Sequence, residues 1–209
     1  MGLAVGAVLA DKRVYNGALN YQPNIMDIMT GWLGNVITIN GMSGPVTAAV
    51  EPAIIRLRLL NASNARILNP ALANGRSFWL IGTDGGLLAA PVSVNNLLLA
   101  PGERADVLLD LRADAGQTIR FISAAFSSMG AGMMGFAPPQ GAAFDLLNIV
   151  VSGAPATNAG SVPGSFAPIS KKCKKVNRNN AVIVHFSIRA PRAASTQKAE
   201  RFSSTVCTA

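Results

Sequence analysis

Short apolar runs separated by turn-forming residues fill the first 151 positions of this chain of 209 residues. The runs cover four to eight residues, and no segment keeps the 3.6-residue period of an amphipathic helix. Gly, Asn and Pro separate them, as in Asn40-Gly41 and Pro101-Gly102, because these residues suit the backbone angles of tight turns. The pattern predicts strands over Leu3–Leu9, Val36–Ile39, Ile54–Leu60, Phe78–Ile81, Val94–Leu99, Ala105–Leu111, Thr118–Ser123 and Leu146–Val151.

About eight short strands at this spacing predict an all-β domain over residues 1–151, a Greek-key β-sandwich or barrel. Hydrophobic residues make up 50% of the chain and charged residues 13%, which is enough apolar material for a core and too little charge for disorder. No apolar run approaches the roughly 18 residues of a membrane-spanning helix, so no membrane span is predicted.

The composition changes towards the C-terminus. Residues 152–170 are rich in Gly, Ala, Pro and Ser and are predicted to be a linker. Residues 1–168 carry nine basic and nine acidic side chains, whereas residues 169–209 carry the whole excess of +8. Residues 171–209 are therefore predicted to be a basic tail, with Ala181–Ile188 as one possible extra strand.

The first ten residues are apolar, but they do not predict a secretory signal. Lys12 and Arg13 follow the apolar stretch, where a signal would place positive charge before it, and no small-residue cleavage site is obvious. The stretch is read as a strand, and the localisation is left open.

Four segments in order carry a resemblance to a known family: Asn35–Gly41, Arg56–Arg66, Ser77–Leu88 and Ala100–Asp110. Together they resemble the middle cupredoxin domain of multicopper oxidases of the bacterial laccase type, over about residues 30–151. Each segment alone is a weak signal, but four in the correct order and spacing are specific. The resemblance implies a cupredoxin-like fold and a periplasmic or secreted family.

The resemblance also implies copper chemistry that this chain lacks the ligands for. The family holds one copper with two His and a Cys, and a three-copper cluster with eight His, in its first and third domains. This chain has one His and two Cys, and imidazole and thiolate are the donors these coppers need. The middle domain in the family is a spacer, so the sequence predicts a fragment or scaffold domain that is inactive as a copper oxidase and binds no cofactor.

Charged residues in the four segments are given structural roles. Arg104 and Asp106 are expected to pair with each other or with turn amides, and Asp84 to cap local amides. Arg56, Arg58 and Arg66 are expected at solvated strand positions, although together they could form a basic patch.

Three methionines are weak metal candidates. Met129, Met133 and Met134 lie in the Gly-rich loop Ser127–Gly141, and thioether sulfur binds Cu(I); a surface loop is the plainer interpretation. Cys173, His185 and Cys207 match no known ligand spacing. The two Cys could form a disulfide if the chain is exported.

Other function classes stay open as alternatives. One is a small enzyme, either an oxidoreductase with loosely bound copper or a hydrolase using His185 with Ser43, although Gly41-Met-Ser-Gly44 is an incomplete nucleophile elbow. The tail has only Phe186 and Phe202 as aromatic residues, so specific nucleic-acid binding is not predicted. The abrupt change at the tail fits either a frameshifted or truncated reading frame or a natural extension.

The apolar composition also predicts self-association. The middle domain of the family packs against a domain on each side, and such faces without neighbours normally become interfaces. A homo-oligomer held by apolar faces is therefore expected.

Overall fold

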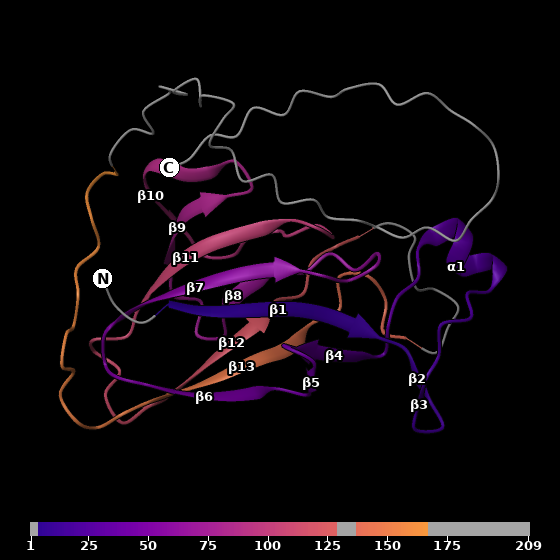
Figure 1. Ribbon diagram of the computed structural model, residues 1–209, viewed down its shortest axis with the longest axis horizontal. Coiled ribbons are helices and arrows are strands. Elements are labelled where there is room, and N and C mark those ends of the chain that lie inside the picture. The colour runs from indigo at the N-terminus through magenta and orange to yellow at the C-terminus, as the bar shows by residue number, and fades with distance from the viewer. Residues whose placement is uncertain (1–3, 129–136, 167–209) are drawn as a thin grey trace, which may run out of the picture. The chain divides into compact units, whose positions relative to one another are not determined.

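The computed structural model describes residues 4–128 and 137–166, and these form two β-sheets packed face to face (Figure 1). The larger sheet has the order β10-β9-β11-β7-β1-β4-β5. Its strands are β1 (Ala4–Lys12), β4 (Val36–Ile39), β5 (Met42–Ser43), β7 (Ile54–Asn61), β9 (Phe78–Thr83), β10 (Gly86–Val94) and β11 (Arg104–Asp110).

The smaller sheet has the order β6-β13-β12-β8. Its strands are β6 (Val46–Val50), β8 (Pro70–Leu72), β12 (Thr118–Ser123) and β13 (Phe144–Val151). A two-stranded ribbon of β2 (Val14–Tyr15) and β3 (Ala18–Leu19) leads to the short helix α1 (Ile25–Thr30). Strand β1 runs parallel to β7, and β6 runs parallel to β13; the other pairings are antiparallel.

Side-chain alternation along the central strands separates an inner from an outer face. In β7, Ile55, Leu57 and Leu59 are buried, whereas the intervening Arg56 and Arg58 lie on the outer face. Successive residues of a strand point to opposite sides of the sheet, so one run of sequence supplies the core and a charged surface together.

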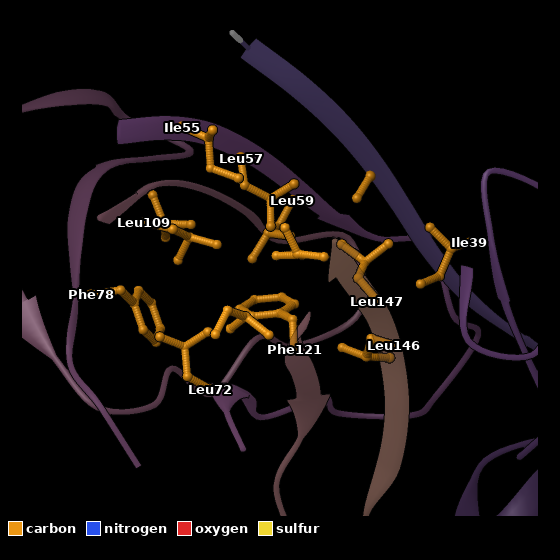
Figure 2. Close-up of a cluster of buried hydrophobic side chains, with 14 of the residues drawn as sticks. Ile39, Ile55, Leu57, Leu59, Leu72, Phe78, Leu109, Phe121, Leu146 and Leu147 are labelled. Carbon is orange, nitrogen blue, oxygen red and sulfur yellow. The ribbon is translucent and has the colours of Figure 1, made fainter. Parts of the chain in front are cut away.

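The core lies between the two sheets, as Figure 2 shows. Leu57, Leu59 and Leu109 come from the larger sheet, and they face Phe121 and Leu147 of the smaller sheet. The rings of Phe78 and Phe121 meet edge to face with centroids 6.3 Å apart, a favourable aromatic geometry. Burying these side chains is the main driving force that holds the sheets together.

A two-residue turn joins β4 to β5. Asn40 and Gly41 both have positive φ, of 51° and 83°, as a type I′ turn requires. The Asn40 side chain also donates to the Gly6 carbonyl and accepts from the Val8 amide, so the turn is fastened to the neighbouring strand β1.

The sequence-based expectation of an all-β sandwich is confirmed. Seven of the eight expected strands are present, with small shifts of their ends. The expectation for Val94–Leu99 is wrong, because β10 ends at Val94 and the following residues turn to the other sheet. There Leu97 donates to the Pro70 carbonyl, and Leu99 exchanges hydrogen bonds with Leu68.

The structure also contains elements that the apolar pattern does not predict. They are the strands β2, β3, β5, β6, β8 and β10 and the helix α1. Strand β10 lies at a sheet edge and contains Pro91 beside a register shift; prolines and bulges at edges discourage pairing with another chain.

Residues 152–166 form no strand, and residues 159–166 of this segment lie against the outer face of the larger sheet. The Ile54 amide donates to the Ala159 carbonyl and the Phe166 amide to the Ala89 carbonyl. Val162 and Phe166 pack on the outward-facing cluster of Ile54, Ile81 and Leu108. We call residues 154–166 the strap. The predicted division into a linker and a basic tail from residue 171 stays a prediction, as Ala181–Ile188 lies outside the described residues.

Within the described residues, no helix has the length and apolar character needed to cross a membrane.

Candidate functional site

One charged pair is sealed inside the domain. Arg66 and Asp11 both have fully buried side chains, and Arg66 Nε lies 3.0 Å from Asp11 Oδ2. Burial lowers the pKa of Arg66 and the Asp11 charge opposes that shift, but a guanidinium stays protonated under these conditions. The expectation that Arg66 occupies a solvated strand position is therefore wrong.

The remaining Arg66 donors bind backbone carbonyls of two distant segments. Nη2 donates to Gly34 and Pro138, at 2.8 and 3.0 Å, and Nη1 donates to Pro139 at 3.1 Å. Asp11 Oδ2 accepts from the Gly34 amide at 2.6 Å. A Cβ at position 34 would lie 2.5 Å from the Lys12 backbone, so only Gly permits this approach. The pair ties β1, the segment after α1 and the segment before β13 together.

Gln140 adds to this fastening. Its side chain accepts from the Ile67 amide and donates to the Ala65 carbonyl, and the Phe126 amide donates to the Gly141 carbonyl. These bonds fix both ends of the loop 127–141. The metal candidates Met129, Met133 and Met134 belong to this loop but lie outside the described residues, so their assignment stays a prediction.

A second charged group lies on the outer face of the larger sheet. Arg56 donates to both carboxylate oxygens of Asp106, with Nε at 2.8 Å from Oδ1 and Nη2 bonded to Oδ2. Arg58, directly opposite Asp106 in the ladder, has its Nε 3.7 Å from Oδ2. The Asp106 hydrogen bonds raise the pKa of Arg56, which is held in one orientation.

Arg104 pairs with a different partner from the one expected. Its Nε lies 2.7 Å from Asp84 Oδ1, and its amide donates to Asp84 Oδ2. These bonds lower the pKa of Asp84. The expected pairing of Arg104 with Asp106 is wrong. The two lie two residues apart on β11, and Asp106 pairs with Arg56 of β7 whereas Arg104 pairs with Asp84 in the turn between β9 and β10.

These side chains surround a hollow of about 520 Å³, which we call the outer hollow. Gly6 of β1 and Gly82 of β9 lie on its floor, and Val8, Leu60 and Leu87 contribute apolar walls. A second hollow of about 590 Å³ lies under the strap, with Ile54, Ile81, Leu108 and Phe166 in its walls, and Arg56 borders both.

Helix α1 presents a third surface. Asn24 and Asp27 form a capping box, and Asp27 also accepts two hydrogen bonds from Arg13, at 2.7 and 2.6 Å. The Arg13 guanidinium lies 4.9 Å from the Trp32 ring centre, and Tyr21 stacks on the same ring. This fastening leaves large apolar side chains in solvent, with exposed fractions of 56–73%: Leu19, Tyr21, Ile25, Ile28 and Met29. We call these five residues the α1 surface.

Side chains for metal or nucleophilic chemistry are not brought together in the described part of the chain. There, no three His, Cys, Asp or Glu side chains are grouped to hold a metal ion. Cys173, His185 and Cys207 lie outside that part. Ser43 is exposed on the edge strand β5, and not at the strand-to-helix turn of a nucleophile elbow.

Sequence reasoning missed the buried Asp11–Arg66 pair and the outer hollow. The two partners of the pair are 55 residues apart, and no local pattern links them. A signal for the hollow was present, since Gly6 and Gly82 interrupt apolar strands, and Gly inside a strand often marks a close approach or an open space.

The comparisons with known proteins agree with this architecture. The family model described as "Multicopper oxidase" matches residues 11–132. Over 105 residues the chain is 50% identical to the cell division protein FtsP of Photorhabdus laumondii, which covers 50% of this chain and 21% of that protein. It is 44% identical over 92 residues to the laccase of Bacillus subtilis, covering 44% of this chain and 18% of the laccase.

Solved structures extend the likeness to most of the fold. The crystal structure of the multicopper oxidase McoA from Aquifex aeolicus matches 86% of this chain and 37% of its own, with 30% identity and a TM-score of 0.67. The chain spans about a fifth of the length of the curated relatives it matches.

Proposed function

This chain belongs to the multicopper oxidase family, and we propose that it acts in that family as a structural scaffold domain without a redox copper of its own. The proposal rests on which metal-binding side chains the chain contains and where they lie in the sequence. The single His and both Cys of the chain, His185, Cys173 and Cys207, follow residue 166, so the sandwich itself offers no imidazole or thiolate. One His cannot supply the ligands of a blue copper and a three-copper cluster.

The internal bonding of the sandwich supports the same role. Within the described residues its long-range salt bridges are Arg–Asp pairs that fasten strands and loops, such as Arg66–Asp11 and Arg76–Asp114. The relatives called cell division protein FtsP match this chain at up to 50% identity over 105 residues, and their name concerns cell division. Both observations favour a domain whose task is to hold a shape.

Copper loading tests this proposal. The full chain is incubated with Cu(II), and separately with Cu(I) under reducing conditions, and then desalted. The proposal predicts no intense absorption towards the red end of the visible spectrum and no oxygen-dependent oxidation of a phenol. A blue protein that oxidises the phenol would overturn it.

The methionine loop gives this test a matched control. If copper is retained after desalting, the triple variant Met129→Leu, Met133→Leu, Met134→Leu keeps the apolar volume but removes the thioethers. If this variant no longer retains copper, the loop holds a metal site, and the proposal of a domain without its own copper is contradicted. If the variant still retains copper, the ion is bound elsewhere in the chain.

We also propose that the chain associates with itself through the α1 surface. Five large side chains that are each more than half exposed present on the order of a few hundred Å² of apolar area. Two copies meeting through this surface would bury roughly twice that area, near the lower end of specific interfaces. Exposed apolar patches above a few hundred Å² normally mark interfaces.

Light scattering at low and high salt tests this association. Wild type is expected to form a dimer or larger assembly at both, because apolar contacts survive salt. Ile28→Glu should give a monomer. Leu98→Glu, at a residue of similar exposure between β10 and β11, should leave the assembly intact. A monomeric wild type refutes the proposal, and dissociation by salt alone assigns the contact to charged residues.

A further inference from the structure

We propose that the outer hollow binds a small organic carboxylate that carries an apolar body. The hollow is about 520 Å³, within the range of 300–1,000 Å³ typical of small-molecule sites. It lies on the sheet itself, so its polar groups are held by paired strands. No part of the proposed scaffold role requires such a hollow.

The charges of the hollow leave one cation uncompensated. Its charged side chains are Arg56, Arg58 and Arg104 against Asp84 and Asp106. Arg56 satisfies Asp106 through two hydrogen bonds, and Arg104 Nε satisfies Asp84. Arg58 has only the 3.7 Å approach to Asp106 and is 65% exposed. The hollow therefore carries a net positive charge, centred on Arg58.

Two guanidinium groups that line the outer hollow keep donors free. Arg58 of β7 and Arg104 of β11 lie diagonally across an antiparallel pair, since Arg58 faces Asp106 and Arg104 faces Leu60. Such diagonal neighbours are about 7–8 Å apart, within reach of long side chains. Among the described residues, neither the Arg58 nor the Arg104 Nη atoms have a hydrogen-bond partner. Planar guanidinium donors match the two oxygens of a carboxylate.

Gly6 makes room for the rest of the ligand. It faces Arg58 in the ladder of β1 and β7, and a Cβ there would meet no atom within 4 Å. At Gly82 the backbone is closely packed instead, because an added Cβ would lie 3.1 Å from the Gly86 carbonyl and 3.2 Å from the Asp106 Cβ, so the open space lies over Gly6. Val8 and Leu87, which are both exposed, flank this floor. An apolar group attached to the carboxylate would pack there.

A titration of the full chain with benzoate tests the site, with benzamide and inorganic phosphate as comparison probes. Amide chemical shifts at Val8, Leu60 and Leu87 are expected to move saturably with benzoate, with a dissociation constant on the order of 1 mM. Neutral benzamide should give no saturation, and phosphate should bind more weakly because it leaves the apolar walls bare. Phosphate binding as tight as benzoate would overturn the assignment to an apolar carboxylate.

Three variants locate the binding. Arg58→Ala removes the uncompensated donor and should weaken benzoate binding about tenfold. Because the Arg58 side chain is mostly exposed, this variant should keep the stability of wild type. Gly6→Ile fills the hollow at a strand position without steric conflict, and should abolish binding while the melting temperature is kept. Arg120→Ala, an exposed arginine paired with Asp145 on the other sheet, should bind as wild type. Unchanged benzoate affinity in both Arg58→Ala and Gly6→Ile would refute the site.

Discussion

Two sets of Arg–Asp pairs in this domain differ in what surrounds them. Arg66 and Asp11 are wholly buried, and both Arg66 Nη atoms donate to carbonyls of Gly34, Pro138 or Pro139. On the outer face, Arg104 and Asp84 are 64% and 45% exposed, and the Arg104 Nη atoms lack partners among the described residues. The same chemistry fastens segments in the interior and presents donors at the surface.

The difference shows where charge contributes to stability here. A buried pair is costly to break, because the remaining charge stays without water or partner. An exposed pair is screened by solvent and contributes little. Substitutions in the buried pair should therefore cost more free energy of unfolding than substitutions in the exposed pair. Substitutions in pairs of intermediate burial should fall between these two.

The largest effect is expected for Arg66→Met. The substitution keeps most of the apolar stem but leaves the Asp11 carboxylate and three carbonyls without their donor. We expect a loss of about 3–5 kcal/mol in the free energy of unfolding, measured by urea denaturation with circular dichroism.

The double variant Asp11→Asn, Arg66→Met is the control. Removing the Asp11 charge as well should recover part of the loss, because no unpaired charge remains inside. If Arg66→Met alone costs less than about 1 kcal/mol, the contrast between interior and surface pairs fails.

Arg13→Ala should have the next largest effect, and it should depend on pH. Hydrogen bonds from Arg13 lower the pKa of Asp27 below its usual value. The contribution is therefore full above the unfolded-state pKa of about 3.9 and disappears as pH falls through the folded-state value. We expect a loss of about 1–2 kcal/mol at pH 7.

Urea denaturation of wild type and Arg13→Ala at several pH values checks the sign. The gap between the two should narrow as pH falls below about 4. A gap that is constant with pH would mean that packing of Arg13 on Trp32, and not its pairing with Asp27, carries the effect.

Arg76→Ala should be weaker. Asp114 is nearly buried, but Arg76 is about one-third exposed, so solvent screening reduces the pair. We expect a loss of about 1 kcal/mol at low salt, decreasing at 1 M salt in the same denaturation experiment. A loss as large as that of Arg66→Met would show that the Arg76–Asp114 pair contributes to stability as a fully buried pair does.

Arg104→Ala should have the smallest effect, because both partners are exposed. No change in the urea midpoint beyond experimental error is expected at either low or high salt. A clear destabilisation would show that the outer-face pairs are structural, and would remove the reason for treating Arg104 as a free donor.

Much of the sandwich could be predicted from its sequence, because alternation of apolar and polar residues reports burial directly. Strand β7 is an example: Ile55, Leu57 and Leu59 face inward, at the positions where every second residue is apolar. Strand β8, of three residues, has too few positions to show a period. Helix α1 was missed because its apolar side chains face solvent and its stability comes from its cap and Arg13.

The charged contacts were less predictable than the strands. Arg56, Arg58 and Arg66 follow one another at short intervals, yet they end as a bidentate partner of Asp106, an exposed donor and a fully buried side chain. Their surroundings depend on segments 50 and 55 residues away. Sequence proximity carries no information about such partners.

Thermal unfolding of the full chain with excess Cu(II) and then with a chelator tests the central claim most directly. A ligand that binds only the folded state raises stability with its concentration. A scaffold domain held by its core and its Arg–Asp pairs should melt at the same temperature in both conditions. A melting temperature that rises with Cu(II) and falls back with the chelator would contradict the proposal that the domain holds no copper of its own.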